Sequence, residues 1–295
     1  MFDMNEITAD NTRNGEDGED FARKVEESIR KKFSKKLFSK FAKAIVEYDL
    51  VRPNDKIAVC ISGGKDSMLM AKLFQELQRH NKFPFGLVFL VMDPGYGEEH
   101  RALLIENARL LGIPVTVFET DIFENVFNIP KSPCYICARM RRGHLYSKAK
   151  ELGCNKIALG HHYDDVIETI LMGMLYGAQM QTMMPRVDSA HFDGMQLIRP
   201  MYLIREDDIK AWRDYHKLDF LQCACKFTAA IAAEGGTDPN TISKRKKVKE
   251  LIRTLKSEDP EIEQNIFTSA ENVNLATVIS YKDNNGVRHR FTDEE

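Results

Sequence analysis

CISGGKDSMLMAKLF, residues 60–74, joins two segments with different hydrophobic patterns. The preceding residues, from Lys56 to Ile61, form a short apolar run whose length suits a buried strand. From Met68 onward, apolar side chains recur on one face of a helix, at Leu69, Met70, Leu73, Phe74 and Leu77. Residues 62–67 are therefore predicted to connect a strand to the N-terminus of a helix.

This junction has the composition of a phosphate-binding loop. A helix N-terminus exposes unpaired N–H groups and the positive end of the helix dipole, and two glycines let the backbone approach an anion closely. Asp66 would repel phosphate unless a cation lies between them, which indicates Mg²⁺. The spacing differs from G-x-x-x-x-G-K-[ST] and from G-x-G-x-x-G. The candidate ATP-binding residues of this loop are Ser62, Gly63, Gly64, Lys65, Asp66 and Ser67, and Asp66 is also a candidate catalytic residue.

Strand-like and helix-like patterns alternate along the rest of the chain. This alternation predicts an α/β fold, with a parallel sheet and helices on both faces. Ligands in such folds bind at the carboxyl ends of the strands, where residues 62–67 and Asp93 are predicted to lie. We therefore expect Asp93 to contact the adenosine. The predicted strands are 56–61, 85–92, 113–118, 156–159 and 196–198, and the predicted helices are 101–111, 138–152, 164–175 and 206–216.

Composition and charge define the expected domain organisation. The chain has 295 residues, of which 43% are hydrophobic and 29% charged, which is typical of a globular protein with a core. No apolar run is long enough to span a membrane and no signal-peptide pattern opens the chain, so a cytoplasmic location is expected. The predicted parts are an acidic disordered tail (1–20), a helical extension (21–50, with one helix over 21–48), the ATP-binding domain (51–222), and a C-terminal extension (223–295) with a linker (237–240), a basic helix (243–256) and a hairpin (284–286).

A second motif, LGHHYDD, occupies residues 159–165 after another predicted strand. Gly160 permits a close approach, and Gly160 and His161 are candidate ATP-binding residues. Paired aspartates at a helix start commonly serve as N-caps. At the carboxyl end of a strand beside a phosphate loop, however, we expect Asp165 to bind Mg²⁺ or to act in acid–base catalysis. A zinc site built on His161 and Asp165 is less favoured, because no third ligand lies nearby in the sequence.

The six cysteines fall into two groups. Cys60 and Cys154 lie in or beside apolar strands, which indicates buried, inert thiols. The other four form the pairs PCYIC and CAC. They are compatible with a redox pair, a structural zinc site, or a [4Fe–4S] cluster held by three cysteines. The pair at Cys134 and Cys137 precedes a basic turn in which Arg141 and Arg142 are candidates for contacts with RNA or a bound anion.

The joint pattern SGGKDS, PCYIC-x3-RRG, KIALGHHYDD, LIRP and CAC resembles the tRNA 2-thiocytidine synthetase (TtcA-like) family of PP-loop ATP pyrophosphatases. The resemblance implies an adenine nucleotide alpha hydrolase-like fold and a tRNA sulfurtransferase that acts on cytidine 32. It also implies ATP, Mg²⁺, a [4Fe–4S] cluster, tRNA, a sulfur donor (cysteine desulfurase or sulfide), and a homodimer. Arg141 is then expected to act in catalysis. The implied cluster ligands are Cys134, Cys137 and Cys223, with Cys225 as the alternative because this chain has C-x-C where the family has C-x-x-C.

Three other functions remain compatible with the motifs. They are a tRNA uridine 2-thiolase with the same machinery, a PP-loop amidotransferase or ligase with structural zinc, and a non-catalytic nucleotide or iron sensor. The net charge of −2 means that tRNA would have to contact local basic patches. The candidate patches are residues 30–36, 139–142 and 244–249.

Overall fold

The computed structural model describes residues 15–80, 82–122, 133–221, 241–283 and 285–293, with only the backbone for residues 15–17, 133–135 and 241–243. The chain divides into two compact units. The first unit consists of Met1–Asp164 and Met184–Thr237, and the second of Asp165–Met183 and Asp238–Glu295. This division differs from the predicted one, because residues 165–183 group with the C-terminal extension. The predicted linker at 237–240 lies outside the described residues.

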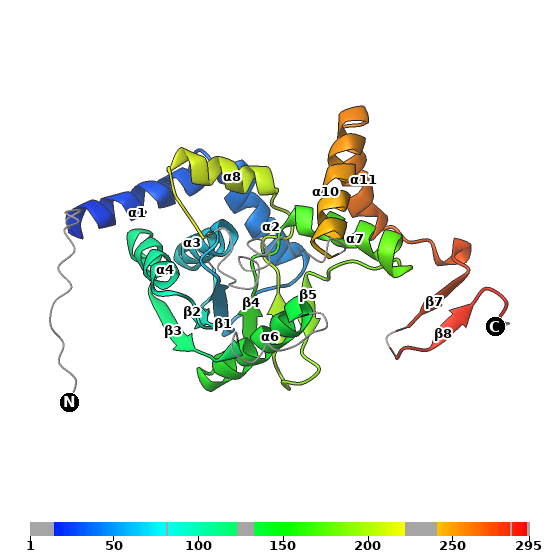
Figure 1. Cartoon of the computed structure of the whole chain (residues 1–295), viewed down its shortest axis with the longest axis horizontal. Helices are drawn as coiled ribbons and strands as arrows, with labels where there is room; N and C mark the ends of the chain where they lie inside the picture. The colour runs from blue at the N-terminus through cyan, green and yellow to red at the C-terminus, as the bar shows by residue number, and fades with distance from the viewer. Residues whose placement is uncertain (1–14, 81, 123–132, 222–240, 284, 294–295) are drawn as a thin grey trace. The chain divides into compact units, whose positions relative to one another are not determined.

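The first unit is built on a six-stranded sheet in the order β3-β2-β1-β4-β6-β5 (Figure 1). Five strands are parallel, as predicted, and β5 runs antiparallel to β6 at one edge. The sequence did not reveal β5, because it has three residues, none of them buried. The strands are β1 (Lys56–Ile61), β2 (Gly86–Asp93), β3 (Val115–Glu119), β4 (Lys156–Ala158), β5 (Arg186–Asp188) and β6 (Gln196–Ile198).

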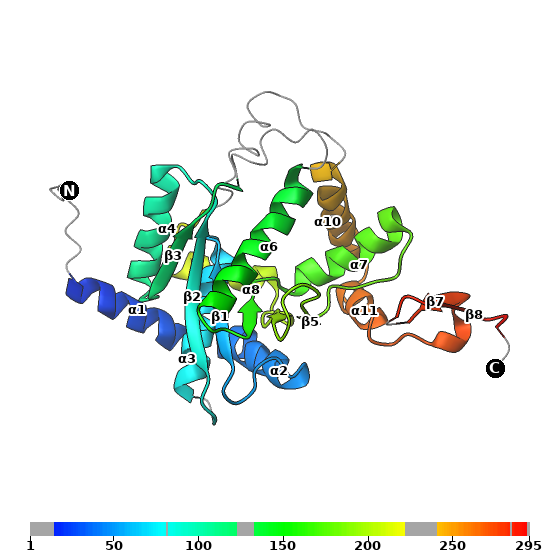
Figure 2. The same ribbon diagram turned by 90° about the horizontal axis from the view of Figure 1, so that it is seen from below.

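Helices cover both faces of this sheet, as the alternation along β1 requires. Ile57, Val59 and Ile61 belong to one hydrophobic core, whereas Ala58 and Cys60 belong to the other. Figure 2 shows α6 (Pro133–Glu151) on the face of the second core. The opposite face is covered by α1 (Gly15–Arg30), α2 (Ser39–Glu47), α3 (Lys65–His80), α4 (Glu98–Leu110) and α8 (Glu206–Tyr215).

The predicted single helix over residues 21–48 is wrong. The segment forms α1, a turn, the π-helix η1 (Ser34–Phe38) and α2, and α1 already begins at Gly15, inside the predicted acidic tail. An α-helix has 3.6 residues per turn, so a four-residue repeat drifts by about 40° each time. The π-helical turn has more residues per turn, which offsets this rotation. The side chain at every fourth position therefore continues to face the core. The buried residues that repeat every four positions are Val25, Ile29, Phe33, Leu37, Phe41 and Ile45.

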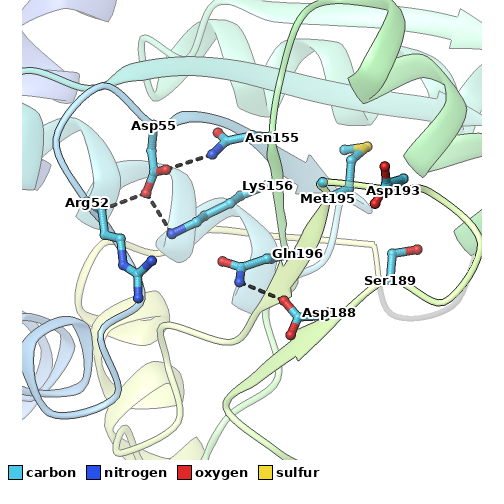
Figure 3. Close-up of a pocket in the computed structure, with 10 residues that line it drawn as sticks. Arg52, Asp55, Asn155, Lys156, Asp188, Ser189, Asp193, Met195 and Gln196 are labelled. Carbon is cyan, nitrogen blue, oxygen red and sulfur yellow. Dashed lines mark hydrogen bonds and ion pairs between the residues drawn. The ribbon is translucent and has the colours of Figure 1, made fainter.

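A polar network fixes the amino ends of β1 and β4 (Figure 3). Lys156 is 2% exposed, and its Nζ lies 2.7 Å from Asp55 Oδ2 and donates to the Leu50 carbonyl at 2.9 Å. Asn155 donates to Asp55 Oδ1 at 2.7 Å, and the Arg52 backbone N–H donates to Oδ2 at 2.6 Å. Arg52, Asp55, Asn155 and Lys156 line a cavity of about 380 Å³ at the amino ends of the strands, whereas residues 62–67 follow the carboxyl end of β1. Because the buried charges are satisfied among themselves, the network holds the two strands in register.

The second unit is mainly helical. It contains all but the first two residues of α7 (Tyr163–Gly177), then α10 (Thr241–Glu258), α11 (Ile262–Ser269) and the short 3₁₀-helix η2 (Leu275–Thr277). The predicted hairpin is confirmed by the antiparallel pair β7 (Ser280–Lys282) and β8 (Arg288–Arg290), while α11 was not predicted. Among the described helices of both units, none has the length and apolar character needed to cross a membrane.

Candidate functional site

The loop of residues 62–64 connects β1 to α3 in the predicted strand-to-helix geometry. Ser67 closes it, since its hydroxyl accepts from the Ser62 N–H at 3.1 Å and donates to the Gly64 carbonyl at 3.0 Å. Gly63 has a φ of +84°, and a Cβ there would lie 2.7 Å from Leu221 Cδ1. Glycine is therefore required for both conformation and space. The first turn of α3 is left with backbone N–H groups that can bind an anion.

Gly160 brings the second motif against the first turn of α3. A Cβ at this position would lie 3.3 Å from the backbone carbonyl carbon of Asp66 and from the backbone nitrogen of Ser67. The contact is possible because β4 pairs directly with β1. The chain runs from β1 to β2 on one side and to β4 on the other, so the loop lies at the topological switch point of the sheet, where ligands bind in this class of fold.

Polar side chains gather around Asp66. His162 Nε2 lies 3.9 Å from Asp66 Oδ1, and His162 Nδ1 lies 3.8 Å from Asp164 Oδ2. Asp164 also accepts from the Glu206 backbone N–H at 2.7 Å, at the start of α8. Lys65 Nζ lies 3.1 Å from the Asp66 carboxylate and 3.4 Å from Glu206 Oε1. The site therefore contains His162, Asp164 and Glu206, which were not selected from the sequence, and the half-buried His161 is their neighbour in the chain.

Asp165, which we expected to bind Mg²⁺ or act in acid–base catalysis, lies in the second unit and forms an ion pair there. Arg245 Nη2 lies 2.5 Å from Asp165 Oδ1, and Arg245 Nε lies 2.7 Å from Glu168 Oε2. Burial lowers the pKa of Arg245, but the two carboxylates outweigh it and raise that pKa above its usual value. Any metal or proton bound by Asp165 must therefore compete with a guanidinium.

Asp93 occupies the carboxyl end of β2, as predicted, but its side chain is already engaged. Its Oδ1 accepts from the backbone N–H groups of Gly95 at 2.9 Å and Tyr96 at 2.7 Å, and Arg101 lies 3.5 Å from Oδ2. The buried carboxylate thus shapes the loop after β2. Arg141 from α6 donates to the Tyr96 hydroxyl at 3.1 Å, which places its guanidinium at the same strand end.

Cys134 and Cys137 lie in the first turn and a half of α6, and Cys137 lies near the carboxyl end of β2. Cys137 is half-buried and packs against a small cluster around Met92, in β2, and Ile122. Cys134 precedes it by three residues in the same helix. The Cys134 side chain and the whole of Cys223 and Cys225 lie outside the described residues.

Cys60 and Cys154 are buried in the core, as predicted. Burial raises the pKa of the Cys60 thiol to about 12 and also raises that of Cys154. Because the thiolate is the reactive and metal-binding form, both side chains are chemically inert at neutral pH.

A parallel sheet with an SGGKDS loop at its switch point defines a PP-loop, ATP-using class of protein. The family model of the PP-loop domain (ATP_bind_3) matches residues 29–225. Curated relatives named tRNA-cytidine(32) 2-sulfurtransferase include one from Neisseria meningitidis serogroup C, which is 32% identical over 82% of this chain and 73% of the relative. Another, from Chromohalobacter salexigens, is 34% identical over 82% of each chain. The chain belongs to the tRNA-cytidine(32) 2-sulfurtransferase family of PP-loop proteins.

A solved structure supports the fold. The U34-tRNA thiolase NcsA from Methanococcus maripaludis, solved with its [4Fe–4S] cluster, superposes with a TM-score of 0.59 at 21% identity. The match covers 86% of this chain and 78% of that protein. At this identity the similarity shows that both chains share the adenine nucleotide alpha hydrolase-like architecture predicted from the sequence.

Proposed function

We propose that this protein catalyses ATP-dependent 2-thiolation of cytidine 32 in tRNA. Family membership supports the reaction, because the matched relatives carry that activity in their name. The structural observation that carries the proposal is the shared location of two motifs. The SGGKDS loop follows β1, and Cys137 packs against Met92 near the carboxyl end of the neighbouring strand β2. The proposed adenylating loop and Cys137 thus lie near the carboxyl ends of neighbouring strands.

The chain's residues account for the adenylation step. The 2-carbonyl oxygen of the base attacks the ATP α-phosphorus, and the bond to the bridging oxygen breaks as pyrophosphate leaves with its electron pair. The N–H groups of the loop and the ammonium of Lys65 would bind the pyrophosphate and stabilise the charge that develops. Lys65 Nζ lies 3.1 Å from Asp66 Oδ1 and 3.4 Å from Glu206 Oε1, so two carboxylates fix the position of the ammonium. The base oxygen becomes part of AMP, which is a better leaving group.

The site has the donor set for a divalent cation at Asp66. Asp66 Oδ1 is buried and accepts no hydrogen bond from the described residues, although Lys65 Nζ lies within ion-pair distance. A carboxylate oxygen is a preferred ligand of Mg²⁺. When bound, Mg²⁺ would offset phosphate charge during the displacement. Asp66 is our proposed ligand, and Asp165 could contribute only if it released Arg245.

Cysteine thiolates are the usual ligands of iron–sulfur clusters, and the chain carries two close cysteine pairs. Cys137 lies near the start of α6, and Cys134 precedes it by three residues in the same helix. We propose these two and Cys223 as ligands, with Cys225 as the alternative third. When bound, a [4Fe–4S] cluster with one iron not held by the protein would supply the sulfur that replaces the adenylated oxygen. Arg141, positioned by Tyr96, would orient the RNA or the adenylate.

The test is a thiolation assay with anaerobically reconstituted protein, unmodified tRNA, ATP and sulfide, followed by digestion and mass spectrometry of the nucleosides. We expect 2-thiocytidine together with pyrophosphate release that depends on tRNA. Detection of 2-thiouridine instead would assign the uridine reaction. Protein that holds zinc and no iron would refute the iron–sulfur mechanism. The sulfur donor (cysteine desulfurase or sulfide), a cytoplasmic homodimer and the acidic tail remain predictions from the resemblance and the composition.

A further inference from the structure

The helix α10 in the second unit is strongly basic. It carries seven lysine or arginine residues and two glutamates. One side of the helix is apolar and packed, with Val248 1% and Ile252 5% exposed. The remaining surface of the helix must therefore display most of the positive charge.

Arg245 does not belong to this displayed charge. It pairs with Asp165 and Glu168, both on α7, and Lys249 lies 3.8 Å from the same Glu168. These contacts tie α10 to α7 within the second unit. The four residues of the basic run KRKK, 244–247, thus have different roles. Arg245 neutralises two carboxylates, and the three lysines are exposed to solvent.

Lys244, Lys246 and Lys247 are exposed, and no ion pair with a described residue engages them. Lys244 Nζ lies 5.4 Å from the ring centroid of Tyr176, near the end of α7 (α7 green, α10 orange in Figure 1). Tyr176 as a residue is 45% exposed. Lys244 lies beside the exposed ring, and Lys246 and Lys247 follow it at exposed positions of the same helix. We call these four residues, Lys244, Lys246, Lys247 and Tyr176, the lysine–tyrosine face.

The first predicted basic patch, residues 30–36, has a different character. Arg30 pairs with Glu76 at 3.1 Å, Lys31 with Glu27 at 2.5 Å, and Lys36 with Asp208 at 3.0 Å. The charge of these three residues is compensated inside the first unit. The other two cations of the patch are Lys35 and Lys32, whose Nζ lies 3.6 Å from the ring centroid of Tyr215. Among the described residues, the patch therefore keeps two cations outside ion pairs, against the three lysines of α10. Charge complementarity to a polyanion therefore favours the second unit.

We propose that the lysine–tyrosine face docks tRNA, with phosphates on the three lysines and an unpaired base on Tyr176. This inference rests on the proposed function, since it names the surface that receives the same substrate. Lysines neutralise phosphates without reading sequence, and exposed aromatic rings stack on bases that are splayed out of single-stranded loops. The protein's net charge of −2 provides no general attraction, so a local patch of this kind is needed.

The decisive experiment compares two triple variants in filter-binding titrations with tRNA at several salt concentrations. Lys244→Ala/Lys246→Ala/Lys247→Ala should weaken binding and reduce the slope of log affinity against log salt by about 2 units. The matched control is Lys24→Ala/Lys43→Ala/Lys82→Ala, which removes the same charge from exposed positions of the first unit and should keep the wild-type slope. Equal slopes for the two variants would overturn the proposal.

Tyr176 provides an independent test of the same face. Tyr176→Ala should weaken tRNA binding roughly fivefold or more, whereas Tyr176→Phe, which keeps the ring, should bind like wild type. If both bind like wild type, no base stacks on this ring. Loss of binding to phosphatidylserine vesicles in the lysine variant, without a change in the tRNA slope, would assign the face to lipid and overturn the proposal.

Failure of this inference is separable from failure of the proposed function. Thiolation by the wild-type protein is measured in parallel. A wild-type enzyme that forms 2-thiocytidine, with a lysine variant that binds tRNA normally, refutes the docking face alone. A wild-type protein that binds tRNA through this face without thiolating it supports the face and refutes the reaction.

Discussion

Replacing Gly160 by alanine tests whether the two nucleotide motifs are held together by direct backbone contact. The added methyl would lie 3.3 Å from Asp66 C and Ser67 N, and 3.4 Å from Asp66 O. All three are backbone atoms, which cannot swing aside as a side chain can. Gly160 is not among the residues with positive φ, so packing alone opposes the substitution. We expect a cost of about 1–2 kcal/mol, which lowers the melting temperature by roughly 2–8 °C.

The same displacement should impair the chemistry. Because a misplacement of about 1 Å can cost 10²-fold in rate, a shift of a few tenths of an ångström should lower ATP-dependent pyrophosphate release by roughly tenfold. The control is Gly143→Ala in α6, where no described atom lies within 4 Å of the new Cβ and helix propensity should raise stability by up to about 1 kcal/mol. A Gly160→Ala protein with wild-type melting temperature and wild-type ATP dependence would refute the reasoning.

Three further variants test individual residues. Asp66→Asn should lower pyrophosphate release by about a hundredfold or more while the melting temperature changes little, because only the charge that would meet the cation is lost; near-normal release would remove Asp66 from the mechanism. Cys137→Ala should lose iron after anaerobic reconstitution, whereas Cys60→Ala should retain it; iron analysis giving equal contents would disprove the ligand assignment. Burial and then the nearby Lys32 lower the pKa of His216 below 6.5, so its contribution to stability is present above pH 6.5 and lost as pH falls. His216→Gln should therefore flatten the fall of melting temperature below pH 6.5, and an unchanged profile would contradict this.

The fold was predictable because its signals are local. The apolar run of β1 and the glycine-rich junction before α3 each depend on residues within a few positions of one another. The edge strand β5 and the π-helix η1 escaped prediction for opposite reasons. The strand β5 buries too little to leave a pattern, whereas η1 is marked only by a four-residue repeat that resembles a helical one.

By itself, the sequence determined the class of site: a pyrophosphate loop at a strand end, a thiol pair at a helix start, and inert cysteines inside the core. Only the tertiary structure decided which neighbours complete that site. Lys65 forms an ion pair with Glu206. Arg245 pairs with Asp165, which is 80 residues away in the sequence. Adjacent Asp164 and Asp165 look equivalent in the motif, yet successive helical residues point about 100° apart. Asp164 therefore faces His162, and Asp165 faces Arg245 on the basic helix α10. Packing rather than composition directs each side chain.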